Sequence, residues 1–166
     1  MNRNWRDYGM LVGVAGVIVI LDQWTKSLVR NNLPFQSTWL PDALQWLGPY
    51  VRIVNWSNSG AAFGTFQNGN SIFTVLAILV IIAIFYYFPR VDPNDWLLRL
   101  AMALQLGGAV GNLIDRLLMH EVTDFIAVGA FPVFNVADAS ISVGVVLLLL
   151  DVWLKERSDR KKQAAV

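Results

Sequence analysis

The sequence predicts an all-α membrane protein, a bundle of four transmembrane helices with a small β-rich outer loop. Three observations favour this fold class. First, 55% of the 166 residues are hydrophobic, and the mean hydropathy is +0.48. Second, charged residues make up only 15% of the chain, whereas a typical soluble domain has about 25%. Third, four segments come close to or exceed the roughly 20 mostly apolar residues that a membrane-spanning helix needs.

The chain is predicted to form one integral membrane domain with four spans. These are residues 8–28, 71–88, 97–119 and 138–154. The second is the clearest because it carries no charged residue, whereas the third contains several polar and charged residues. The segments between the first and second spans and between the third and fourth, about residues 29–70 and 120–137, are predicted to be outer loops.

The first span has an alternative interpretation. Only residues 8–21 are apolar before Asp22, so the segment crosses the bilayer only if the helix continues to about Leu28. Arg3 and Arg6 followed by a short apolar stretch are also typical of a secretory signal peptide. No A-x-A-like cleavage site follows the apolar stretch, however, and we therefore expect a retained span.

The distribution of Lys and Arg predicts the orientation of the bundle. Arg3 and Arg6 precede the first span, Arg90 lies between the second and third, and five cations occupy residues 155–162. The loop at residues 120–137 has no Lys or Arg. Because cytoplasmic segments are enriched in these residues, both termini are expected in the cytoplasm and both long loops outside.

The first outer loop is predicted to contain a small β-sheet. Residues 50–57 alternate between apolar and polar side chains, as a half-buried strand does, and glycine and proline residues on both sides supply turn signals. Several tryptophans in this loop could rest at the membrane interface. The loop is therefore expected to be a folded unit on the membrane surface.

Composition excludes several kinds of site. The chain has no cysteine, which removes disulfides, thiolate nucleophiles and cysteine-based metal sites. The single histidine, His120, argues against a histidine-rich metal site or a Ser-His-Asp triad, and we expect it to lie just past a helix end. Net charge is +1 and no basic stripe is present, so no nucleic-acid partner is predicted.

Four polar residues lie inside predicted spans at one depth, towards the outer face. They are Asp22 in the first span and Asn112, Asp115 and Arg116 in the third. A charged side chain inside a span costs at least about 2.5 kcal/mol, so such residues usually find partners. Two interpretations stay open. The polar groups could simply be paired, with Asp22 bound to Lys26 and Asp115 or Arg116 reaching the interface, or they could form a functional site.

Glycines are expected to bring helices close together. Gly107, Gly108 and Gly111 lie within the third span, and residues 9, 13 and 16 are glycines at helical spacing in the first. Small residues allow close backbone approach between transmembrane helices. We interpret all six as packing positions.

Two carboxylates, Asp124 and Asp138, lie on either side of an almost wholly apolar strip. Taken singly, Asp124 could be a turn residue and Asp138 a helix N-terminal cap. If the strip folds back at the interface, the two acids meet and share one proton. The charged member could then take a proton from water while the protonated member binds a scissile carbonyl. Neither acid is singled out as the protonated one.

Five short motifs lie in order along most of the chain. They are residues 22–26 (DQWTK), 58–64 (NSGAAFG), 111–116 (GNLIDR), 122–125 (VTDF) and 134–138 (FNVAD). In these motifs and in their order, the sequence resembles the lipoprotein signal peptidases, the type II signal peptidases of bacterial inner membranes.

The resemblance implies a membrane aspartic endopeptidase that removes the signal peptide from diacylglyceryl-modified prolipoproteins and cuts before the lipidated cysteine. It implies no metal or other cofactor, and a cradle and mobile flap formed by the first outer loop. The partners would be these substrates and membrane lipid, and we expect a monomer in the bacterial cell inner membrane with the site at its outer face. The implied residues are Asp124 and Asp138 as the catalytic pair; Asn58, Gly60, Asn112, Arg116, Asn135 and Ala137 at the substrate; and Asp22 and Asp115 in supporting roles.

Two other classes of function are weighed against this one. A small transporter or a proton- or ion-relay subunit also uses intramembrane acids with an arginine. That class predicts polar residues throughout the bilayer depth, whereas here they crowd at one face and residues 71–88 have none that is charged. A third class, an assembly protein, would not need the acids.

Overall fold

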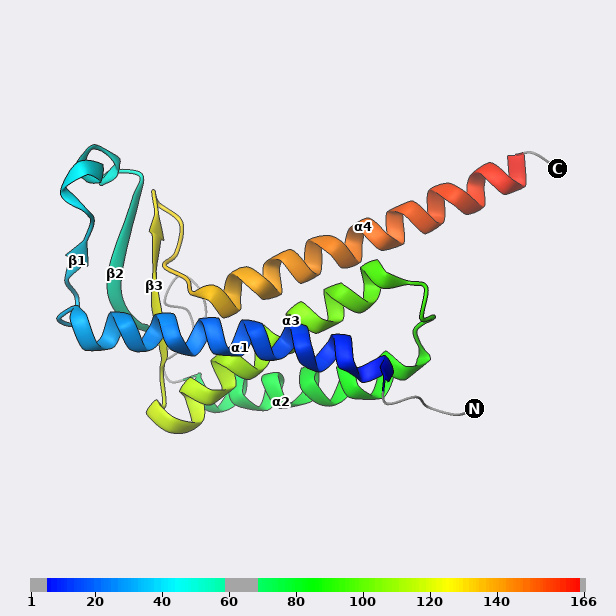
Figure 1. The fold of residues 1–166 in the computed structure, drawn as a ribbon, viewed down its shortest axis with the longest axis horizontal. Coiled ribbons are helices and arrows are strands. Elements are labelled where there is room, and N and C mark those ends of the chain that lie inside the picture. Colours follow the sequence, from blue (N-terminus) through cyan, green and yellow to red (C-terminus); the bar gives the residue numbers. More distant parts are fainter. Residues whose placement is uncertain (1–5, 59–68, 165–166) are drawn as a thin grey trace.

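Four helices form the body of the protein (Figure 1). The computed structural model describes residues 6–58 and 69–164. All four helices are long and apolar enough to cross a membrane, which confirms the predicted fold class. Their bounds are α1 (Arg6–Asn32), α2 (Asn70–Tyr87), α3 (Trp96–Met119) and α4 (Val136–Ala164).

A three-stranded antiparallel sheet lies at one end of the bundle (Figure 1). Its order is β1 (Thr38–Trp39), β2 (Val51–Asn58) and β3 (Val122–Val128), and a 3₁₀ turn, η1 (Asp42–Leu47), joins the first two strands. The strand predicted at residues 50–57 is confirmed. β3 comes from the second outer loop and was not predicted as a strand, because its side chains are buried on both faces and so lack polar alternation.

Helix α3 is the centre of the bundle and contacts α1, α2 and α4. A methyl group at Gly108 would lie 2.4 Å from the carbonyl oxygen of Ala137, and one at Gly107 would lie 2.7 Å from Ile18. Glycine is thus needed for the approach of α1 and α4 to α3, as predicted. The expectation for residues 9, 13 and 16 is wrong, because nothing lies within 4 Å of a methyl group there.

The outward faces of the helices are apolar. Ile20, Ile82 and Leu149, on three different helices, are 68%, 59% and 60% exposed. Contiguous exposed apolar surface of this kind is unfavourable in water and typical of contact with lipid. The closely packed apolar core, which includes Leu11 and Phe88, lies towards the end of the bundle away from the sheet.

Both described ends of the chain lie at the end of the bundle opposite to the sheet (Figure 1). Here Lys155 on α4 pairs with Asp151 one turn earlier and with Asp95, which directly precedes α3. α4 extends ten residues beyond the predicted limit at 154, to Ala164. At the opposite end of α3, His120 takes a left-handed conformation with φ 63°, which ends the helix as expected.

Candidate active site

The strip between Asp124 and Asp138 folds back on itself, as predicted. Asp124 lies in β3, and the backbone N–H groups of Phe125 and Ile126 donate to the carbonyl oxygen of Phe134 at 3.0 and 2.8 Å. Phe134 donates in return to Ile126 at 3.1 Å. This reversal directs the chain into the first turn of α4, where Asp138 lies, and both carboxylates line one cavity.

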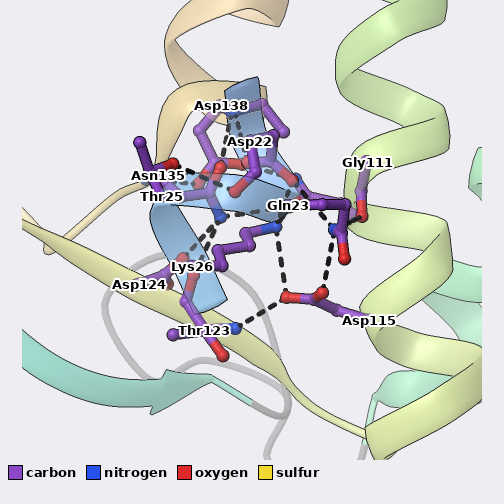
Figure 2. A network of polar contacts seen from close by, with 12 residues as sticks. Asp22, Gln23, Thr25, Lys26, Gly111, Asp115, Thr123, Asp124, Asn135 and Asp138 are labelled. Carbon is purple, nitrogen blue, oxygen red and sulfur yellow. Dashed lines mark hydrogen bonds and ion pairs between the residues drawn. The ribbon is translucent and has the colours of Figure 1, made fainter. Parts of the chain in front are cut away.

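Asn135 joins the two carboxylates (Figure 2). Its Nδ2 donates to Asp124 Oδ1 at 2.7 Å, and its backbone N–H donates to Asp138 Oδ2 at 3.2 Å. The remaining oxygens also accept amide hydrogen bonds: Asn58 donates to Asp124 Oδ2 at 3.1 Å, and Asn112 donates to Asp138 Oδ1 at 2.8 Å. All four carboxylate oxygens are thereby fixed.

Asp138 also caps α4. Asn135 Oδ1 accepts the Asp138 backbone N–H at 2.9 Å, while Asp138 Oδ2 accepts the Asn135 backbone N–H. This reciprocal pair is a capping box, which satisfies two N–H groups at a helix start. The capping role considered for Asp138 therefore coexists with its place beside Asp124, because the cap sets the direction of its side chain.

Burial raises the pKa of Asp124 from 3.8 to about 7, and the charge of Asp138 acts in the same direction. Hydrogen bonds from Asn58 and Asn135 and the charge of Lys26 oppose this increase. The carboxyl is only 2% exposed, so water cannot stabilise its charged form. Near neutral pH, Asp124 therefore carries a proton in a large fraction of molecules.

This raised pKa predicts how stability depends on pH. Folded Asp124 binds its proton more tightly than the unfolded chain does, so its contribution is complete below about pH 4 and is lost as pH rises through about 7. A pKa raised from 3.8 to about 7 corresponds to at most about 4 kcal/mol of the free energy of unfolding. We expect the melting temperature of the wild-type protein in detergent to fall between pH 5 and pH 8 by more than that of Asp124→Asn. An equal change in melting temperature for the two proteins would contradict this assignment.

Beside the acid pair, a buried ion cluster joins α1 to α3 (Figure 2). Lys26 Nζ lies 2.8 Å from Asp22 Oδ2 and 3.1 Å from Asp115 Oδ2, and all three side chains are fully buried. The pairing of Asp22 with Lys26, one of the possibilities left open by the sequence, is confirmed. The idea that Asp115 reaches the interface is wrong, because Lys26 and the backbone N–H of Thr123 hold it inside the protein.

Each acid of this cluster fixes the residue before one member of the acid pair. Asp22 Oδ1 accepts the backbone N–H of Ala137 at 3.0 Å. Asp115 Oδ2 accepts the backbone N–H of Thr123 at 3.1 Å. Asp22 thus contacts the first turn of α4, and Asp115 contacts β3. Both acids thus set where the backbone presents the carboxylates.

The other predicted substrate residues differ in position. The guanidinium of Arg116 lines the cavity and lies 5.6 Å from the centre of the Phe73 ring. Asn58 and Asn112 also line it. Ala137 is fully buried against α3, so its side chain acts through packing. Gly60 and the expected flap lie outside the described residues.

The cavity has a volume of about 630 Å³ and is lined by residues of α2, α3, α4, β2, β3 and the fold-back strip. Apart from the acid pair and four other polar side chains, Asn58, Asn112, Arg116 and Ser142, its lining is apolar. The apolar part includes Phe73, Val122, Phe131, Pro132, Val133, Phe134, Ile141 and Val143. Within residues 6–58 and 69–164, no cluster of three or more His, Cys, Asp or Glu side chains is arranged to hold a metal ion.

Sequence reasoning missed the central position of Lys26, which was considered only as a partner for Asp22. It also missed Gln23, whose Nε2 donates to Asp115 Oδ1 at 3.0 Å and to the carbonyl oxygen of Gly111 at 3.1 Å. A signal was present, because a lysine within a membrane span needs compensation by more than one group.

Fold and site together define a multi-pass membrane protein in which a buried carboxyl pair faces an apolar cavity at one end of the helix bundle. A family model described as signal peptidase (SPase) II matches residues 14–154. The chain belongs to the signal peptidase II family, which confirms the resemblance found in the sequence.

Curated relatives and solved structures agree with this membership. The lipoprotein signal peptidase of Mesorhizobium japonicum is 38% identical over 167 residues, covering 96% of this chain and 94% of the relative. That of Halalkalibacterium halodurans is 37% identical over 156 residues, covering 92% and 97%. A bacterial membrane enzyme solved by the in meso method at 2.3 Å resolution matches with a TM-score of 0.81 and 31% identity, over 91% of both chains.

Proposed function

We propose that the protein is a membrane aspartic endopeptidase that removes the signal peptide from diacylglyceryl-modified prolipoproteins and cuts before the lipidated cysteine. Family membership and relatives called lipoprotein signal peptidases support the removal of signal peptides from lipoproteins. One observation carries the aspartic mechanism: Asn135 holds Asp124 and Asp138 together at the wall of one cavity.

In the proposed reaction, protonated Asp124 donates a hydrogen bond to the scissile carbonyl oxygen. Charged Asp138, at the positive end of α4, takes a proton from water as the water oxygen attacks the carbonyl carbon. The Asp124 proton passes to the carbonyl oxygen, giving a neutral tetrahedral diol. When the C–N bond breaks, Asp138 gives its proton to the leaving amine, and the diol returns a proton to Asp124.

The surroundings of the pair fit a lipidated substrate. A peptide anchored by diacylglycerol presents its cleavage point at the membrane interface, next to apolar chains. The cavity beside the acids offers mainly apolar walls, and Phe73, Phe131 and Val143 line it on three separate segments. Arg116 and Asn112 line the same cavity as the acids and carry N–H groups suited to bind peptide carbonyl oxygens.

The proposed location is the bacterial inner membrane, with both termini in the cytoplasm and the acid pair at the outer face. The cations around residues 155–162 and the placement of the described chain ends away from the sheet support this orientation. A reporter fused after Val166 is expected to behave as cytoplasmic, and one inserted near Gly69 as external. The reverse pattern would place the acids on the wrong side for exported substrates.

The experiment that tests the function uses purified protein and one prolipoprotein prepared with and without its diacylglyceryl group. Cleavage before the modified cysteine is expected for the lipidated form, and much slower cleavage for the unmodified form. The competing relay function predicts charge movement across a proteoliposome membrane with no peptide cleavage. Along α3, the buried charged side chains are Arg99 and Asp115, one near each end of the helix, rather than spread over its length.

A further inference from the structure

Lys26 has a contact that its ion pairs do not explain. Its fully buried ammonium lies 3.0 Å from Asn112 Oδ1, in addition to its contacts with Asp22 and Asp115. An ammonium group has three N–H donors and no acceptor. The two acids and the Asn112 amide therefore use all three donors. The contact with Asn112 connects the ion cluster to the acid pair.

This contact determines the orientation of the Asn112 amide. Because Lys26 can only donate, it selects the amide oxygen, and the NH₂ group must lie on the other side. There Nδ2 donates to Asp138 Oδ1 at 2.8 Å. The rotated amide would direct its NH₂ at the ammonium and its oxygen at the Asp138 carboxylate, so both contacts would become repulsive.

The same orientation reaches Asp124. Asn112 Oδ1 accepts a second hydrogen bond, from Asn135 Nδ2 at 3.0 Å, and this nitrogen also donates to Asp124 Oδ1 at 2.7 Å. By fixing the Asn112 oxygen, Lys26 thus orients the Asn112 amide towards Asp138 and the Asn135 amide towards Asp124. Buried hydrogen-bonded chains of this kind have one favourable arrangement, because any reversed member leaves unpaired polar atoms.

We propose that Lys26 is a positioning residue for the reaction, which fixes the Asn112 amide so that Asn112 and Asn135 hold both carboxyl groups in their reactive orientation. This role rests on the proposed peptidase function. It is distinct from the stabilising role of Lys26, which runs through Asp22 and Asp115 to the backbone. The two roles separate in experiments because only the first one requires Asn112.

A double-mutant cycle tests this role, with kcat and KM measured for cleavage of the diacylglyceryl-modified prolipoprotein. Lys26→Met is expected to lower kcat about 10- to 100-fold, with KM changed less than about threefold. Asn112→Ala is expected to lower kcat at least as much, and the double variant should fall no further than Asn112→Ala alone. Effects that multiply in the double variant would overturn the proposal.

Gln23→Met is the matched control. Gln23 donates to the same two acids, Asp22 and Asp115, but among the described residues no hydrogen bond joins its side chain to the Asn112 amide. Its effect on kcat is expected to multiply with that of Asn112→Ala. If Gln23→Met also shows no additional effect in the Asn112→Ala background, general loosening of the cluster explains both results and the positioning role is wrong.

Lys26→Gln adds a conservative variant. It removes the same charge as Lys26→Met but keeps an N–H donor, so kcat should recover in part while melting temperature stays equal to that of Lys26→Met. Equal kcat for both variants would overturn the proposal.

If Lys26→Met does not fold, the cycle is run in the Asp22→Asn background. There one buried negative charge is removed together with the ammonium, so the cluster keeps its charge balance. Absence of cleavage by wild-type protein would instead reject the peptidase function itself.

Discussion

Asparagine in place of either Asp124 or Asp138 is expected to lower kcat for prolipoprotein cleavage by at least about 10³-fold. Asparagine keeps the size of the side chain but can neither take a proton from water nor give one to the carbonyl oxygen. Because the reaction needs both transfers, each single variant should lose nearly all activity, and the double variant should be little worse. KM is expected to change far less, since the cavity walls are unaltered.

Asp42→Asn is a suitable control for this experiment. Asp42 begins the 3₁₀ turn of the outer loop, is exposed and lies outside the cavity lining. Its replacement also removes one carboxylate from the same side of the protein, and activity is expected to stay within about twofold of wild type. Wild-type turnover in either Asp124→Asn or Asp138→Asn would refute the acid-pair mechanism directly, whatever the result for Asp42.

Asn135→Ala has the second largest expected effect, because one side chain performs two tasks. Its Nδ2 holds Asp124 at 2.7 Å, and its Oδ1 caps the Asp138 backbone N–H at 2.9 Å. Loss of the cap alone costs about 1 kcal/mol of stability. Loss of the Asp124 contact frees a buried carboxyl to turn, and we expect kcat to fall about 100-fold as measured with the lipidated substrate.

Asn135→Ser separates the two tasks. A serine hydroxyl at this position can still accept the Asp138 N–H as a helix cap, but it has no second donor that reaches Asp124. The melting temperature of Asn135→Ser should therefore lie above that of Asn135→Ala, because the cap is kept, while kcat falls as in Asn135→Ala. A serine variant with wild-type kcat would mean that the amide contact to Asp124 is unimportant for the reaction.

Asp22 and Asp115 explain how the acid pair is held in a defined position at the end of a helix bundle. Asp22 and Asp115 accept the backbone N–H groups of Ala137 and Thr123, each directly before one member of the pair. Lys26 then neutralises both acids in the same buried space. A buried ion pair of this kind contributes little net stability unless all of its groups are satisfied, and here each acid also positions a segment of the site.

The sequence by itself determined the fold class, the presence of four long apolar helices, the strand at residues 50–57 and the two acids that the structure brings to one cavity. These features are visible because hydropathy is a local property, and because a carboxylate within or beside an apolar segment is costly wherever the chain places it. The family resemblance added the order of five motifs, each readable without knowledge of contacts.

Only the tertiary structure decided which groups meet. Asp22 and Ala137 are separated by 115 positions, and Lys26 and Asn112 by 86, so no local pattern links them. β3 was missed because it is buried on both faces and lacks alternation. The raised pKa of Asp124 likewise depends on burial and on the charge of Asp138, two consequences of packing rather than of spacing. The sequence shows which residues carry the chemistry, and the packing of the other helices around α3 determines which of them are in contact.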